Sequence, residues 1–151
     1  MKLLRFVLPF LLILFIASCK TSDDKKSQIT PRMAEIKVSW GEYYKKRNEI
    51  SGYIVSDALI IKEEKRGGRK MFDTLGDVDT ERYVPLLREI KDSILAIQAL
   101  HDAGDTLRYL AYKDKKAGAN LRFFWNPKYK AYATDAFRNI YDSLNALVPT
   151  K

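Results

Sequence analysis

Apolar residues recur at every third or fourth position between residues 36 and 61. The series runs through Ile36, Trp40, Tyr43, Ile50, Ile54, Ala58 and Ile61, with Arg47 as its one interruption. This spacing is typical of one face of an α-helix. Thr30-Pro31 supplies a capping hydroxyl followed by a proline that suits the first turn, so the sequence predicts that this helix begins near residue 30.

Residues 53–61 are also rich in β-forming side chains, so an α+β fold with a short strand there is the alternative. We favour the helix because the spacing of three or four residues continues on both sides of this stretch. Gly41 and Gly52 each cost about 1 kcal/mol relative to alanine in a helix, which allows a bend or a break. The run Arg66-Gly67-Gly68-Arg69 then ends the element.

Three further segments follow a predicted loop at residues 70–79. A second helix begins with Thr80 or a neighbour as its cap, and its apolar face comprises Tyr83, Leu87, Ile90, Ile94 and Ile97. Residues 107–125 fit two short helices or one interrupted helix. Asn126-Pro127 is a capping pair for the last helix, whose face comprises Tyr129, Ala133, Phe137, Ile140, Leu144 and Leu147. Four helical segments with apolar faces predict an all-α bundle.

The N-terminus has a different pattern, typical of a secretory signal. Lys2 and Arg5 precede an apolar run over residues 6–16, which is shorter than the roughly 20 residues that a membrane-spanning helix needs. Ile16-Ala17-Ser18-Cys19 then resembles the lipobox of bacterial lipoproteins. This resemblance implies cleavage before Cys19 and acylation of its thiol, which would anchor the protein in a membrane. It covers only about the first twenty residues, and the rest of the chain resembles no family that we recognise.

The resulting organisation is a signal peptide at residues 1–18, a lipidated cysteine with a flexible tether at 19–29, and a helical interaction domain at 30–151. The full chain has a net charge of +8, and loss of Lys2 and Arg5 with the signal lowers it to +6. A moderate positive charge favours acidic partners, such as anionic lipid headgroups or an acidic protein. Export argues against nucleic acid as the partner.

The side chains that could carry catalysis are few. His101 is the only histidine and Cys19 the only cysteine, so neither a zinc site nor a histidine-dependent nucleophile is expected. Asp73, Asp77, Asp79 and Glu81 lack the glycine and glutamate positions of a calcium-binding EF-hand, and a solvated loop with helix-capping aspartates explains them. Gly67-Gly68, between Arg66 and Arg69, has the composition of an anion site but is better explained as an exposed turn. We therefore predict a protein that is not an enzyme and has no metal or cofactor.

Aromatic and basic residues alternate in two places, a mixture that is enriched at protein interfaces. Core packing explains the rings that lie on the apolar faces. The predicted interface combines the remaining rings with neighbouring cations: Tyr44, Lys45, Arg47, Arg122, Phe123, Lys128, Lys130 and Tyr132.

These features predict a lipid-anchored adaptor or structural subunit of an envelope protein complex. Its expected location is the bacterial cell envelope, at the periplasmic face or surface of the outer membrane. In layout the chain is similar to small accessory lipoproteins of secretion systems, including type VI systems. The alternatives are a periplasmic immunity or inhibitor protein against a toxin or lysozyme, and a carrier of a lipid or glycan.

Overall fold

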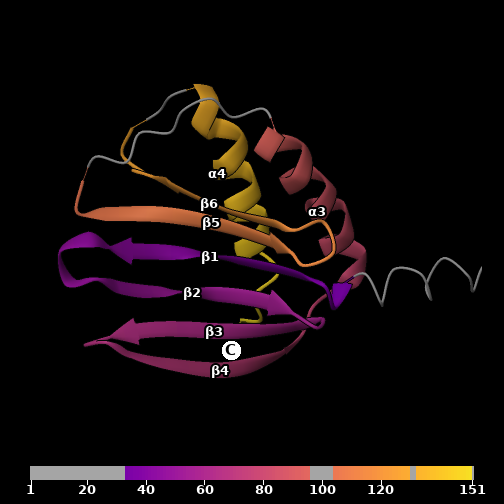
Figure 1. The fold of residues 1–151 in the computed structure, drawn as a ribbon, viewed down its shortest axis with the longest axis horizontal. Coiled ribbons are helices and arrows are strands. Elements are labelled where there is room, and N and C mark those ends of the chain that lie inside the picture. The colour runs from indigo at the N-terminus through magenta and orange to yellow at the C-terminus, as the bar shows by residue number, and fades with distance from the viewer. Residues whose placement is uncertain (1–32, 96–103, 130–131, 151) are drawn as a thin grey trace, which may run out of the picture. The chain divides into compact units, whose positions relative to one another are not determined.

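Six antiparallel strands form one sheet, in the order β4-β3-β2-β1-β5-β6 (Figure 1). The computed structural model describes residues 33–95, 104–129 and 132–150, all within the unit Met33–Lys151. The strands are β1 (Ile36–Tyr44), β2 (Glu49–Ser56), β3 (Leu59–Arg66), β4 (Arg69–Asp77), β5 (Thr106–Asp114) and β6 (Ala119–Trp125). A short 3-10 turn, η1 (Lys45–Arg47), follows β1, and two helices, α3 (Thr80–Leu95) and α4 (Tyr132–Asn145), follow β4 and β6.

The predicted all-α helical bundle is wrong, since the described residues form mainly a β-sheet with two helices. The helix expected over residues 36–61 is the β1–β2 pair and the start of β3, the loop expected at 70–79 is largely β4, and residues 107–125 form β5 and β6. The alternative strand at 53–61 spans the end of β2, a turn and the start of β3. The helices expected after residue 79 and before residue 148 are confirmed as α3 and α4.

Two-residue turns explain why the segment from β2 to β4 folds as hairpins. Asp57 and Ala58 have φ angles of 53° and 63°, and Gly67 and Gly68 have φ angles of 55° and 79°. Positive φ at both central residues gives the turn a twist that matches the flanking strands, which is why such turns dominate two-residue hairpins. Glycine adopts these angles without strain, so Gly67-Gly68 is the exposed turn that the sequence predicts.

Strand β1 lies in the middle of the sheet and pairs with both β2 and β5. Trp40 is opposite Tyr53 on β2 and opposite Leu110 on β5, so these three side chains share one face. Gly41 is opposite Gly52 and Tyr109, which places those residues on the other face. β1 therefore contributes residues to both sides of the sheet.

The hydrophobic core lies between one face of the sheet and the two helices, which both cover that face (Figure 1). Trp40 and Trp125 are fully buried there, and the ring of Trp125 packs 5.7 Å from that of Phe137 on α4. The indole N–H of Trp40 donates a hydrogen bond of 2.9 Å to the side-chain oxygen of Asn145, near the end of α4. This bond ties the central strand to the last helix.

Helix α3 begins with an acidic cap. The N–H groups of Glu81 and Arg82 donate hydrogen bonds of 3.1 and 3.3 Å to a carboxylate oxygen of Asp79. Because the first N–H groups of a helix have no partner within the helix, this aspartate stabilises its start. Tyr83 and Ile90 are buried against the core, as the helical spacing predicts. The capping role that the sequence suggests for the aspartates is thus confirmed at Asp79, although Asp73 and Asp77 lie on β4 rather than in a loop.

Tyr109 fills a depression on the face of the sheet opposite the helices. A Cβ atom added at Gly52 would lie 2.6 Å from the Tyr109 hydroxyl and 2.3 Å from the backbone oxygen of Trp40, so the ring fits only because Gly52 has no side chain. Tyr109 is 3% exposed, and its ring lies 6.3 Å from that of Phe124. Its hydroxyl has no hydrogen-bond partner among the described residues, and burial raises the pKa of this group.

Candidate functional site

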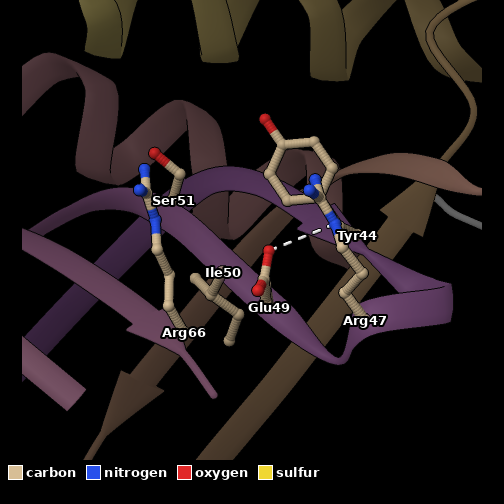
Figure 2. Close-up of a pocket in the computed structure, with 6 residues that line it drawn as sticks. All are labelled: Tyr44, Arg47, Glu49, Ile50, Ser51 and Arg66. Carbon is tan, nitrogen blue, oxygen red and sulfur yellow. Dashed lines mark ion pairs between the residues drawn. The ribbon is translucent and has the colours of Figure 1, made fainter. Parts of the chain in front are cut away.

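A polar pocket of about 290 Å³ opens where β1 and β3 end and β2 begins, and we call it the arginine pocket. Its lining residues come from the last position of β1, from η1, from the first half of β2 and from the last position of β3 (Figure 2). They are Tyr44, Arg47, Glu49, Ile50, Ser51 and Arg66.

The connection between β1 and β2 determines where Arg47 lies. Asn48 has a φ angle of 52°, a left-handed conformation that asparagine tolerates, and its N–H donates a hydrogen bond of 3.3 Å to the backbone oxygen of Lys45. The N–H of Lys45 in turn donates to the backbone oxygen of Asp105 at 2.8 Å, and the ammonium of Lys46 lies 2.6 Å from the Asp105 carboxylate. These contacts join η1 to the segment just before β5.

Two guanidinium groups stand on either side of Glu49 in the arginine pocket (Figure 2). Arg47 forms an ion pair of 3.2 Å with Glu49 and lies 4.8 Å above the ring of Tyr44. Arg66 lies 3.7 Å from the carboxylate of Glu64 on β3. The lining residues thus include two cations and one carboxylate.

The existing ion pairs leave the arginines available for another anion. The side chains of Arg47 and Arg66 are 63% and 65% exposed. Exposed ion pairs contribute only about 0 to 1 kcal/mol, so exchanging one for an incoming carboxylate costs little. An arginine also has five N–H donors in a planar fork, more than one carboxylate uses. The pocket is therefore suited to holding an anionic group.

Tyr44 is held in place by a hydrogen bond as well as by the cation above its ring. Its hydroxyl donates to a carboxylate oxygen of Glu42 at 2.7 Å. This hydrogen bond raises the pKa of Tyr44, since loss of the proton would leave two negative groups side by side. The hydroxyl therefore stays protonated at neutral pH and presents no negative charge to a ligand.

The lining residues offer charge and hydrogen-bond donors rather than a catalytic set. Ser51 has no histidine or lysine among the other lining residues that would act as its base. Within residues 33–95, 104–129 and 132–150, no three or more His, Cys, Asp or Glu side chains gather in a way that would hold a metal ion.

The structure brings some of the predicted interface residues together and separates others. Tyr44 and Arg47 line the arginine pocket, with Lys45 exposed next to them. Arg122 is exposed on β6, at the opposite edge of the sheet from β4, and Lys128 is exposed just after β6.

The second aromatic and basic segment is also partly turned inward. Phe123 is half-buried, and its ring packs 5.3 Å from that of Phe137 in the core. Lys130 and the side chain of Tyr132 fall outside the described residues, as do Cys19 and His101. The predicted surface is therefore two separate regions, and the arginine pocket lies in the first of them.

The sequence did not indicate that Arg66 and Ser51 belong to the same site as Arg47. In the β2–β3 hairpin Ile50 is opposite Lys65, which brings the end of β3 beside the start of β2. The positive-φ turn at Asp57-Ala58 sets this register, but these two residues are not a typical turn pair. In the sequence Arg66 belongs instead to the Arg66-Gly67-Gly68-Arg69 run, which has the composition of an anion site but is better explained as an exposed turn.

Comparison with models of known protein families and with curated proteins finds no match for this chain. Among the described residues, neither helix is long and apolar enough to cross a membrane.

Proposed function

We propose that this protein is a lipid-anchored, non-enzymatic binding protein of the bacterial envelope, an adaptor or structural subunit of an envelope complex such as a secretion system. In this proposal acylated Cys19 attaches the chain to the membrane, and the sheet domain holds a partner protein. The observation that supports partner binding most directly is the arginine pocket, in which Arg47 and Arg66 present two exposed guanidinium groups to one cavity.

The chemistry of the pocket suggests an acidic group as its ligand. A carboxylate of a partner protein accepts two parallel N–H bonds from one guanidinium, a geometry that lysine does not offer. Ser51 adds a hydroxyl donor, and Tyr44 supplies a ring that holds Arg47 in place. An aspartate or glutamate side chain, or a C-terminal carboxylate, fits this combination.

The anchor is tested by replacing the acylation site. Cys19→Ser should abolish incorporation of labelled palmitate and should move the protein from the membrane to the soluble fraction. Cells expressing the unchanged chain at the same level are the control. Equal membrane retention of the variant, with its leader processed in the same way, would contradict the anchor.

The pocket is tested by site-specific photo-crosslinking in intact cells. A photo-reactive amino acid at Ser51 should crosslink a defined envelope protein, and Arg47→Ala with Arg66→Ala should reduce that crosslink at least roughly tenfold, as expected for loss of charge-assisted contacts. The same probe at Lys116, an exposed residue between β5 and β6, is the matched control. Crosslinks of equal yield from both positions, or no loss in the double variant, would argue against the pocket as the binding site. A toxin as the crosslinked partner would make the protein an inhibitor instead of an adaptor.

A further inference from the structure

Strand β4 forms an open edge of the sheet and carries exposed apolar side chains. It is the outermost strand beyond β3 and lies on the side of the sheet away from α4 (Figure 1). Met71 is 51% exposed and Phe72 is 58% exposed, and residues 69–74 are all exposed. Long edge strands of this kind are templates for pairing with another chain, and proteins usually protect them.

The protection of this edge is incomplete. β4 has no proline, and its register shifts against β3 between Ile60 and Ile61, opposite Leu75. Such a bulge interrupts pairing locally. The stretch from Arg69 to Thr74 lies before the bulge and pairs with β3 in regular register. Among the residues that the structure describes, this stretch therefore pairs on one side only, with β3.

The register of the β3–β4 hairpin determines which backbone groups face outward. Arg66 and Arg69 flank the two-residue turn and are the first and fourth residues of the β-turn. In such a turn the N–H of the fourth residue pairs with the carbonyl of the first, so the backbone groups of Arg66 and Arg69 face each other. Hydrogen-bonded and non-hydrogen-bonded positions then alternate along an antiparallel pair. By this alternation, the backbone groups of Lys70, Phe72 and Thr74 point away from β3 and are positioned to pair with a further strand.

The order of side chains on β4 is complementary to itself. Arg69, Met71 and Asp73 share one face, with the cation two residues before Met71 and the anion two residues after it. When a second β4 runs antiparallel with its own Met71 opposite this one, Arg69 lies opposite Asp73 of the partner subunit. By symmetry Asp73 lies opposite Arg69 of the partner subunit, which gives two opposite-charge pairs.

Other symmetric registers lack this complementarity. Centring the pair on Lys70 or on Asp73 places two like charges directly opposite each other, which is destabilising. Centring it on Phe72 places Met71 opposite Asp73 of the partner subunit and leaves Arg69 without an anion. The register centred on Met71 also places Lys70 opposite Phe72 of the partner subunit, and both of these positions have outward-facing backbone groups.

We propose that β4 pairs with β4 of a second copy of this chain, antiparallel and centred on Met71, so that one sheet continues through both copies. A twofold axis through the middle of the strand pair produces a closed dimer, because each copy then has no further β4 edge to offer. This inference is independent of the arginine pocket and of Cys19. It extends the proposed function by naming a second copy as one partner of the domain.

Charge reversal at the two paired positions tests the register. In Arg69→Asp, each residue 69 would lie opposite an aspartate, and in Asp73→Arg each residue 73 would lie opposite an arginine. Each variant alone should dimerise at least roughly tenfold more weakly than the unchanged chain. An equimolar mixture of the two should form heterodimers, because both 69–73 pairs then regain opposite charges. Recovery in the mixture also shows that both variants are folded.

The measurement is sedimentation equilibrium of the purified full chain in detergent, with two affinity tags to identify heterodimers by sequential capture. Arg122→Asp is the matched control, since it makes the same change at an exposed residue of the other edge strand, β6, and should leave dimerisation unchanged. A monomeric unchanged chain would overturn the proposal. So would a dimer that resists both β4 variants, a mixture that does not recover, or a dimer lost only in Arg122→Asp.

Discussion

The buried hydroxyl of Tyr109 leads to a prediction about stability and pH. Tyr109→Phe removes only this hydroxyl and keeps the ring that fills the depression over Gly52. A buried polar group without a partner costs about 1–3 kcal/mol of stability. At pH 8 the free energy of unfolding of the variant should therefore exceed that of the unchanged protein by about 1 kcal/mol or more.

The difference should increase in alkali. An unfolded tyrosine ionises with a pKa of about 10, whereas burial raises the pKa of Tyr109 in the folded protein. Because the folded pKa is raised, ionisation of Tyr109 does not lower the stability of the protein below about pH 10. Above that pH the unfolded tyrosine ionises and the folded one does not, so the protein loses stability as the pH rises toward the folded pKa. At pH 11, one unit above the unfolded value, the loss from this residue reaches about 1.4 kcal/mol. Tyr109→Phe escapes that loss, so its advantage should grow to about 2.5 kcal/mol.

Urea unfolding followed by tryptophan fluorescence at pH 8 and pH 11 measures both values. Other groups that titrate between these pH values affect both proteins alike, so the comparison between them isolates Tyr109. Tyr129→Phe, which changes a ring that is 52% exposed, is the matched control. A Tyr109→Phe advantage that does not change between pH 8 and pH 11 would refute the burial of this hydroxyl.

Three further predictions concern the fold. Gly52→Ala should lower the free energy of unfolding by about 1–3 kcal/mol, because the added Cβ would lie 2.3 Å from the backbone oxygen of Trp40, and thermal unfolding measures this. Asn145→Ala should cost about 1–3 kcal/mol in the same assay, since it leaves the buried Trp40 N–H without its acceptor. Asp114 accepts hydrogen bonds from the N–H groups of Lys116 and Ala117, and the first cause of its lowered pKa is the bond from Ala117. Asp114→Ala should therefore destabilise the protein by about 1 kcal/mol at pH 7, an effect that shrinks as the pH falls below about 4, whereas a cost that is unchanged at pH 3 would argue against this role.

The helices were predictable from sequence because each has one apolar face. In α3, Tyr83 and Ile90 face the core while Arg88 and Glu89 are exposed, which is the pattern that helical spacing detects. The start of α3 was also predictable, because its capping aspartate lies directly before it. Asn126 misled the prediction, since its side chain accepts a hydrogen bond from the N–H of Lys128 in a turn, before α4 begins at Tyr132.

The strands were not recognised because the central ones carry buried residues on both faces. On β5, Leu107 and Tyr109 are buried on one face and Leu110 and Tyr112 on the other, so apolar and polar residues do not alternate. The series Leu107, Leu110 and Ala111, at i, i+3 and i+4, is also compatible with a helix. Gly67-Gly68 is the local signal for a hairpin, but the sequence-based interpretation makes it an exposed turn that ends a helix and not a turn between two strands.

The candidate site was predictable only where its residues are close in sequence. Tyr44 and Arg47 belong to one cluster of rings and cations, and the sequence predicted them as interface residues. Arg66 joins them because of strand register, which in turn depends on a turn at Asp57 and Ala58 that lacks glycine and asparagine. Register of this kind is a property of the paired strands, so it cannot be predicted from the sequence of one segment alone.

The central position of β1 has a consequence for biogenesis. During synthesis from the N-terminus, residues 36–77 can assemble the β1–β4 meander early, since its neighbours in space are neighbours in sequence. The edge of β1 that pairs with β5, including the position of Trp40 opposite Leu110, then stays unpaired until β5 has been made and has inserted next to it. A nascent chain is therefore vulnerable to self-association throughout the elongation of α3, and a premature stop codon after that helix should yield inclusion bodies rather than a smaller soluble domain.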